Sequence, residues 1–185
     1  MSVSDRKVIK VRGSFFMYTI AFLYFFGGLF SCYFLIKTGL KFESKYAFLY
    51  LGGGIMLMPF FMYETLWGLP GFLPPKRALF TIETGKDGRI VQKKKSIAFE
   101  DIKDIEFKRN PITLFNEIFV ETYSNKKKIR ISTYALLLEV NFYDLVDKHI
   151  YPYMTEDAKR VWNHKLSNDP FLSSIDYERK IHHTD

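Results

Sequence analysis

The sequence is poor in cysteine, and Cys32 is the only one among its 185 residues. A single thiol excludes an intramolecular disulfide and any zinc cluster that is built from several cysteines. The HExxH and CxxC spacings of common metal sites are also missing, and the four histidines stand in no metal-binding spacing. We therefore expect no metal and no cofactor.

Motifs of the common enzyme classes are absent as well. Gly85 and Gly88 belong to a hairpin turn with an Asp-Gly signal rather than to a phosphate-binding loop, because no helix is predicted after them and no Lys-Ser/Thr pair directly follows Gly88. No serine stands in a nucleophile motif. The acidic cluster at residues 100–106 lacks the spacing of a calcium loop, so a solvated face explains it better. These absences predict a non-catalytic protein and leave an enzyme with an unfamiliar site as the minor alternative.

Charged residues are missing from two long segments, although the mean hydropathy of −0.08 is that of an ordinary soluble protein. Residues 13–36 carry no charge, and residues 46–63 form a second uncharged run that is followed by Glu64. At about 1.5 Å per residue, each segment can cross a hydrocarbon core of roughly 30 Å. We predict transmembrane helices over 13–36 and 46–69. Their length and all-round apolar character argue against a buried helix of a soluble protein.

The first apolar segment has two alternative interpretations, a cleaved signal peptide and a lipoprotein signal. A cleaved signal peptide is disfavoured, because the segment is longer than a typical signal core and no A-x-A-like site follows it. Leu29, Ser31 and Cys32 superficially resemble the end of a lipobox, but Phe30 stands where a small residue is usual and the apolar run continues. Cys32 is better explained as a small apolar residue inside a helix.

The distribution of Lys and Arg predicts the orientation of this helical hairpin. Basic residues are concentrated in segment 1–12 and after the second apolar run, whereas the connecting segment 37–45 has fewer. We therefore expect a multi-pass protein of the cell membrane with both termini in the cytoplasm. The expected parts are a cytosolic basic N-terminus over 1–12, a short extracytoplasmic loop over 37–45 and a Pro/Gly linker over 70–75.

Small residues within both apolar segments are candidates for helix packing, because they let two helix backbones approach closely. In one interpretation these residues pack the two helices of the hairpin against each other. In the other they form a contact surface for a second copy of the chain or for a helix of a partner membrane protein. Glu64 is close to the end of the second span, where a solvated or snorkelling position is expected. The candidates for packing are Gly27, Gly28, Ser31, Gly52, Gly53 and Gly54.

Residues 76–151 have the pattern of a small antiparallel β domain. Two hairpins are predicted, over 78–92 with its Asp-Gly turn and over 117–132. Residues 136–150 place apolar side chains at helical spacing, which predicts an amphipathic helix that closes the sheet. The expected fold class is an α+β membrane protein, in which a transmembrane helical hairpin precedes a β domain closed by a C-terminal helix. A short helix and a loose tail are expected over 152–185.

The domain also carries a motif after its first hairpin. An I-x-F-x-D-I-x-x-I-x-F run is formed by Ile97, Phe99, Asp101, Ile102, Ile105 and Phe107. This run, after a strand, an Asp-Gly turn and a basic returning strand, resembles bacterial pleckstrin-homology-like (PH-like) domains, which are often attached to one or two N-terminal transmembrane helices. The whole chain resembles an uncharacterised family of short two-span membrane proteins from Bacillus-like Firmicutes. The resemblance implies a PH-like fold and a binding or assembly role without a catalytic site, and it transfers no lipid-binding motif to this chain.

Lysine-rich turns are the candidate contact sites of the domain. Residues 76–130 have an excess of basic residues, whereas residues 131–185 have an excess of acids. Near an anionic bilayer each basic residue adds about 1 kcal/mol of attraction, whereas the alternative role of such lysines is to keep edge strands soluble. The excess is small and accompanies no recognised motif, so nucleic acid is not an expected partner. The candidates for contact with anionic lipid or a partner are Lys93, Lys94, Lys95, Lys126, Lys127, Lys128 and Arg130.

These observations predict a membrane-anchored, non-catalytic binding or assembly module with a cytosolic PH-like domain. The lipid bilayer is its first expected partner. The alternative is an accessory or regulatory subunit of a larger membrane complex, such as a transporter or a secretion machine, with foreign spans docked on the glycine-rich faces.

Overall fold

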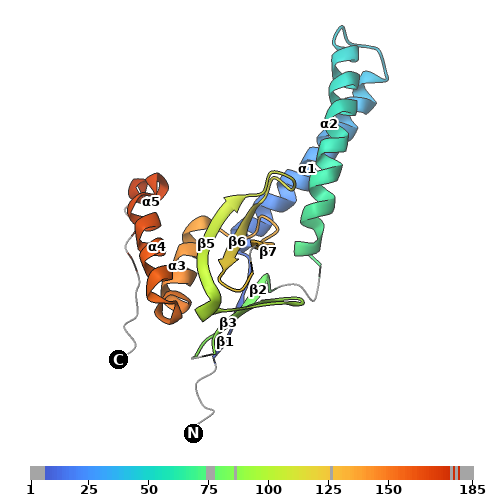
Figure 1. The fold of residues 1–185 in the computed structure, drawn as a ribbon. Coiled ribbons are helices and arrows are strands. Elements are labelled where there is room, and N and C mark those ends of the chain that lie inside the picture. The colour runs from blue at the N-terminus through green and yellow to red at the C-terminus, as the bar shows by residue number, and fades with distance from the viewer. Residues whose placement is uncertain are drawn as a thin grey trace.

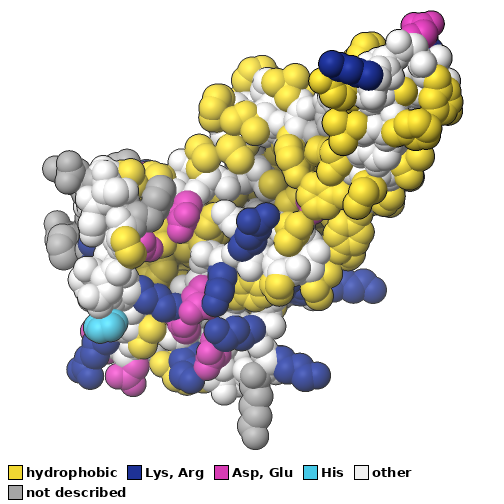
Figure 2. Space-filling model, turned by 90° about the horizontal axis from the view of Figure 1, so that it is seen from above, with side chains coloured by type: hydrophobic (Ala, Val, Ile, Leu, Met, Phe, Trp, Pro, Cys, Tyr) yellow, Lys and Arg dark blue, Asp and Glu magenta, His cyan; other side chains and the backbone are white. Residues whose placement is uncertain are grey.

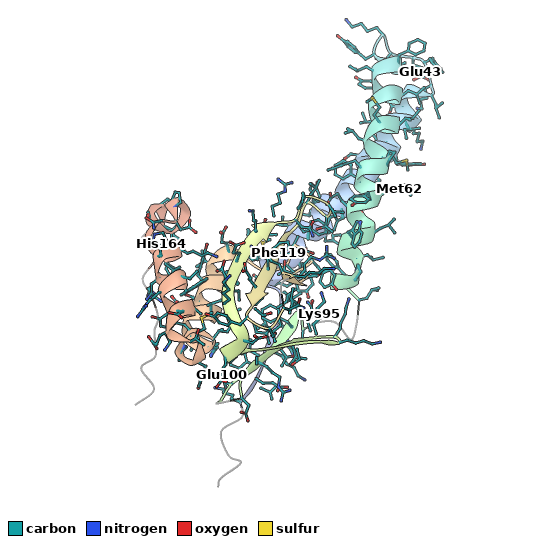
Figure 3. All side chains as sticks on the ribbon, viewed as in Figure 1. Glu43, Met62, Lys95, Glu100, Phe119 and His164 are labelled. Atoms are coloured by element: carbon teal, nitrogen blue, oxygen red, sulfur yellow. The ribbon has the colours of Figure 1, made fainter. Side chains whose placement is uncertain are left out.

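A computed structural model shows an apolar helical hairpin joined to a domain of sheets and helices (Figure 1). Glu43 marks the tip of the hairpin, and His164 lies on a helix at the opposite side of the domain (Figure 3). The structure describes residues 7–73, 78–85, 87–125, 127–175, 177 and 179.

The hairpin consists of α1, Phe15–Gly39, and α2, Ala47–Gly68, followed by the short 3-10 helix η1, Leu69–Gly71. Both helices are long and apolar enough to cross a membrane. Most of their side chains point outward, so hydrophobic side chains cover the surface of the hairpin, whereas charged side chains gather over the domain (Figure 2). Helix α1 ends about one turn later than predicted, and Lys37 in this last turn complements the partial negative charge of a helix C-terminus.

The domain contains two antiparallel sheets, one with the strand order β1-β2-β3-β4 and the other with the order β5-β6-β7. The Asp-Gly signal lies between β2 and β3, whose register begins at Glu83 and Arg89, so this hairpin is as predicted. A short 3-10 helix, η2, Phe99–Asp101, links the sheets. The strands are β1 (Val8–Val11), β2 (Phe80–Glu83), β3 (Arg89–Gln92), β4 (Lys95–Ala98), β5 (Ile102–Arg109), β6 (Asn116–Thr122) and β7 (Ile129–Ile131).

Strand β1 lies within the segment where the sequence predicts only a basic N-terminus. It pairs with β2 from Val8 opposite Glu83 to Val11 opposite Phe80, although the whole hairpin separates the two strands in the chain. A four-residue strand carries too little periodicity to be recognised without its partner. The helical hairpin is therefore an insertion between two neighbouring strands of one sheet. The chain leaves that sheet after β1 and returns to it at β2.

Helices follow the second sheet. The predicted closing helix is observed as α3 and begins at Glu139. Leu136 and Leu137, which the prediction included in the helix, are buried in the segment that leads into it. The short helix predicted next is observed as α4, where the Thr155 side chain caps the first turn by accepting from the backbone N–H of Ala158. The bounds are α3 (Glu139–His149), the 3-10 helix η3 (Tyr151–Tyr153), α4 (Glu156–Ser167) and α5 (Pro170–Ser174).

The tail expected to be loose is packed on the domain as far as the described residues extend. Leu172 of α5 is buried. Further along, the Nη2 atom of Arg179 lies 3.0 Å from the Oδ1 atom of Asp147, which is fully buried on α3. In this described part, the tail is held by Asp147 together with further contacts, among them a hydrogen bond from Arg179 to Asn163. Residues 180–185 are outside the described residues.

The base of the hairpin is packed against the domain. The ring of Phe25 on α1 lies 5.7 Å from that of Phe115, measured between centroids. The hydroxyl of Tyr63 on α2 donates a hydrogen bond of 2.7 Å to the carbonyl oxygen of Ile112. Both domain residues belong to the turn between β5 and β6, so this turn marks the hairpin-facing end of the domain.

Candidate functional site

Some candidate glycines lie between the two helices. A Cβ atom at Gly28 would lie 2.3 Å from the ring of Phe61, and one at Gly54 would lie 2.7 Å from the Cγ1 atom of Ile36. Gly39, which the sequence analysis did not select, is equally close to α2, with 2.6 Å to the backbone nitrogen of Leu51. These positions leave no room for a side chain, so they allow the close approach of α1 and α2.

Other candidate glycines face outward. A Cβ atom at Gly27, Gly52 or Gly53 would meet nothing within 4 Å. Ser31 is exposed one turn after Gly27. The structure therefore divides the candidates between the inside of the hairpin and its open surface, where packing of another helix stays a prediction.

One lysine-rich turn lies far from the hairpin. Strand β6 starts beside the hairpin-facing turn and ends at Thr122, and its length corresponds to about 20 Å of extended chain. The turn between β6 and β7, with Lys127 and Lys128, follows that distant end. Lys126 falls outside the described residues. Lys128 is engaged by Glu106 at 3.3 Å and by Glu121 at 3.9 Å.

The other lysine-rich turn lies near the base of the hairpin. Gln92, immediately before it, donates through Nε2 to the carbonyl oxygen of Ser132 at 2.8 Å. Tyr134, two residues further on, packs so closely on Gly71 that a Cβ there would lie 2.7 Å from it. Lys93 and Tyr134 line one small cavity. The β3–β4 turn is therefore the hairpin-proximal one.

Lys95 and Arg130 connect this proximal turn to the second sheet. The Nζ atom of Lys95 donates to the carbonyl oxygen of Arg130. Burial and the nearby charges of Arg130 and Lys93 lower the pKa of Lys95 below its usual value. Arg130 itself pairs with the buried carboxylate of Glu117 at 3.3 Å. Positive charge is thus concentrated at this turn, where Lys93 and Lys94 are exposed.

A site that the sequence analysis missed lies where the hairpin meets the domain. Glu64 is only 2% exposed, so the expected solvated or snorkelling position is wrong. Its neighbours from α1 and from the β5–β6 turn bury it, and no single-sequence signal specifies that packing. Glu64 lines a cavity of about 320 Å³ together with Arg109. We call this space the junction cavity, and its remaining lining residues are Met17, Ile20, Ala21, Tyr24, Phe25, Leu114, Phe115 and Ala135.

Metal chemistry has no candidate site in the described part of the chain. No group of three or more His, Cys, Asp or Glu side chains there could hold a metal ion. The junction cavity combines one carboxylate and one guanidinium with apolar walls, and no nucleophile–base pair lines it.

Comparison with known proteins finds relatives but no structural neighbour. The profile of a family of unknown function, DUF5381, matches residues 7–171, a range that includes β1, the hairpin and the domain. In Bacillus subtilis strain 168, the uncharacterized lipoprotein YfjD is 31% identical over 163 residues, which cover 86% of this chain and 88% of YfjD. The uncharacterized protein YfjE from the same strain is 34% identical over 131 residues, which cover 69% of this chain and 86% of YfjE. No solved structure matches the chain.

Proposed function

Since the chain belongs to the DUF5381 family, whose function is unknown, we propose its role from its own geometry: it is a membrane-anchored, non-catalytic binding or assembly module. In this proposal α1 and α2 cross the cell membrane and the domain lies in the cytoplasm. The pairing of β1 with β2 carries the proposal. A chain that leaves a sheet, forms two apolar helices and returns to the same sheet has both flanks on one side of a bilayer. The Lys and Arg distribution assigns that side to the cytoplasm.

The domain is proposed to be PH-like. Support comes from its antiparallel sheets, which are followed by a closing helix, as the resemblance implies. Strand β1 contributes to this domain from the other side of the hairpin, so the domain includes residues 8–11 in addition to the predicted range.

Thiol labelling tests the topology in whole cells. In a Cys32→Ala background, Ser44→Cys places a thiol in the loop of the hairpin, and Ser167→Cys places one on α4. A membrane-impermeant maleimide should label the first variant in intact cells and the second only after permeabilisation. Labelling of Ser167→Cys in intact cells would contradict the cytoplasmic location of the domain.

The lipoprotein name of the relative YfjD raises the question of a lipid anchor on Cys32. We propose that the hairpin, rather than a lipid, anchors this chain. Cys32 lies on α1, and its side chain is buried, with 1% exposed. Processing before Cys32 would remove β1 and more than half of α1, so the first sheet would lose an edge strand. Intact mass spectrometry of the purified protein should show residues upstream of Cys32 and no added acyl mass, and a chain that begins at a lipidated Cys32 would overturn this part.

The proximal lysine turn is proposed to touch anionic headgroups, while the distal turn remains in solution. The test compares Lys93→Gln/Lys94→Gln with Lys127→Gln in the full chain, reconstituted in nanodiscs with and without phosphatidylglycerol. Hydrogen exchange at the β3–β4 turn should slow with phosphatidylglycerol, and salt or the double substitution should abolish the effect. Lys127→Gln, which removes one charge from the distal turn, is the control. Equal exchange in neutral and anionic nanodiscs would contradict the contact.

A second candidate function is that of an accessory subunit in a larger membrane complex. The open faces at Gly27 and Gly52 favour it, because small residues allow a foreign helix to approach. Purification from mild detergent should then recover a stoichiometric membrane partner, and Gly27→Leu or Gly52→Leu should release it. Leu66→Phe, at another outward position, serves as the control. A protein that purifies alone under all conditions would exclude this function.

A further inference from the structure

The junction cavity is built by four separate parts of the chain. Its walls come from α1, from α2, from the end of β5 with the turn that follows it, and from Ala135 in the segment after β7. Because the cavity lies at the base of the hairpin, it sits at headgroup level if the hairpin spans the bilayer. Apolar side chains such as Met17 and Ile20 form one wall, and polar groups are few. This composition is that of a site for an amphipathic molecule.

The carboxylate of Glu64 is the unusual group in this cavity. The side chain is almost completely buried, and its Oε1 atom makes no hydrogen bond to any residue that the structure describes. An ionised carboxylate without a partner is strongly unfavourable in a poorly hydrated environment. Glu64 therefore requires a hydrogen-bond donor, preferably one with a positive charge.

Arg109 does not satisfy this requirement. Its Nε atom donates to the carbonyl oxygen of Leu114 at 2.9 Å, and the side chain is exposed at the domain side of the cavity. Both Arg109 and Glu64 belong to the described residues, and the structure contains no ion pair of 4.0 Å or less between them. A buried anion and an exposed cation thus share one cavity without contact, which is complementary to a molecule that carries both charges.

We propose that the junction cavity binds a phospholipid with a primary ammonium headgroup, of the phosphatidylethanolamine type. The ammonium group donates hydrogen bonds to Glu64 beside the ring of Tyr24, and the phosphate pairs with the guanidinium of Arg109. An acyl chain follows the apolar wall at Met17 and Ile20. The site rests on the proposed membrane anchoring, since the hairpin must place the cavity at headgroup level.

The charge pattern selects among the common headgroups. Phosphatidylglycerol has hydroxyl donors but no cation for Glu64, and its net negative charge is repelled by the carboxylate. Phosphatidylcholine has a cation, but its quaternary nitrogen has no N–H donor for the orphaned oxygen. A primary ammonium supplies both a positive charge and N–H donors. The site should therefore prefer phosphatidylethanolamine over phosphatidylglycerol and phosphatidylcholine.

Native mass spectrometry of the full chain in detergent micelles tests this preference. The probes are phosphatidylethanolamine, phosphatidylcholine and phosphatidylglycerol with identical acyl chains. We expect the phosphatidylethanolamine adduct to persist at about ten-fold lower lipid concentration than the others, as a charge-assisted hydrogen bond implies. Glu64→Gln and Arg109→Gln should each remove this preference. Their matched controls are Glu43→Gln at the tip of the hairpin and Lys108→Gln next to Arg109, which should keep it.

Two outcomes overturn the inference. One is equal affinity of the unsubstituted protein for the three lipids, and the other is an unchanged preference in Glu64→Gln. If Glu64→Gln does not fold, Glu64→Leu is the second variant: it also removes the acceptor, so it should lose the preference, and an unchanged preference in it would overturn the inference. Alkaline extraction of membranes separates this inference from the proposed function. A protein that stays in the membrane without lipid preference refutes only the lipid site, whereas a protein that is extracted refutes the anchoring.

Discussion

The hairpin and the domain bury different kinds of side chain. In the hairpin most large apolar side chains point outward and several small residues lie between the helices, whereas in the domain the apolar side chains form the core and most charges face outward (Figure 2). The buried acids differ in the same way. Asp147 in the domain is satisfied by Trp162, Tyr177 and Arg179, whereas Glu64 in the hairpin keeps an oxygen without a partner.

This difference separates a carboxylate that stabilises the fold from one that lacks a partner. A carboxylate with three partners stabilises the tertiary structure, because its hydrogen bonds replace the water that it loses. A buried carboxylate oxygen without a partner costs free energy, and the proposed lipid site would supply the missing donor to Glu64. The predictions that follow test the two regions against each other.

The largest expected effect is at Asp147. Asp147→Ala removes the acceptor for Trp162 Nε1, 2.7 Å away, and the ion pair with Arg179. We expect a loss of about 3–5 kcal/mol in the free energy of unfolding, together with faster proteolysis of the C-terminal segment. Urea unfolding of the full chain in detergent measures the first effect. Asp157→Ala, whose side chain is 80% exposed, is the control, and equal stability of the two variants would contradict the role of Asp147.

The same substitution should have unequal effects in the two regions. Ile118 on β6 is 2% exposed and Ile55 on α2 is 55% exposed. Ile118→Ala should cost about 2–5 kcal/mol of unfolding free energy, because it opens a cavity in the core. Ile55→Ala should have little effect on the unfolding of the domain. Tryptophan fluorescence during denaturation compares them, and similar losses at both positions would refute the contrast between the regions.

Glu64 should respond with the opposite sign to Asp147. In lipid-free detergent, Glu64→Leu replaces an orphaned carboxylate by an apolar group of similar size. We expect the free energy of unfolding to rise by about 1–3 kcal/mol. Thermal unfolding monitored by circular dichroism provides the measurement. A strong destabilisation would show that Glu64 has a structural partner like that of Asp147.

The smallest expected effect is a pH dependence at Glu106. Burial raises the pKa of Glu106, but the hydrogen bonds and charges of Lys165 and Lys128 outweigh it and lower the pKa below its ordinary value of 4.5. A carboxyl whose pKa is lower in the folded state stabilises the fold above that ordinary value, and this contribution is lost as the pH falls through the folded-state pKa. Because the pair is partly exposed, the contribution is about 1 kcal/mol or less.

Lys165→Met should weaken this pH dependence. The difference in stability between the variant and the unsubstituted protein should be largest near neutral pH and should shrink as the pH falls below about 4.5. Lys159→Met, which removes a pair with the exposed Glu156, is the control. A difference that is independent of pH would contradict the role assigned to Glu106.

Much of the architecture is predictable from local patterns. The two apolar runs predict the hairpin, because length and absence of charge are properties of a continuous segment. The Asp-Gly turn predicts the β2–β3 hairpin, and the spacing of Phe142 and Val146 predicts α3 for the same reason. Strand β1 cannot be predicted from its local pattern, because the strand that it pairs with, β2, follows the whole hairpin in the chain.

The candidate site was predicted less well, because exposure depends on packing. The two lysine turns look alike in the sequence, yet one lies beside the hairpin and the other at the far end of β6. Gly27 and Gly28 are adjacent, yet one faces outward and the other packs on Phe61.

The sequence by itself determined which segments are apolar enough to cross a membrane, where the strands of the hairpins turn, and that no known catalytic motif is present. Only the tertiary structure decided that β1 and β2 enclose the hairpin in one sheet, that one lysine turn lies beside the end of α2 while the other follows the far end of β6, and that Glu64 and Arg109 share a cavity. Hydropathy and turn signals act over a few residues, whereas burial and charge pairing arise between segments that are distant in the chain and meet only when it folds.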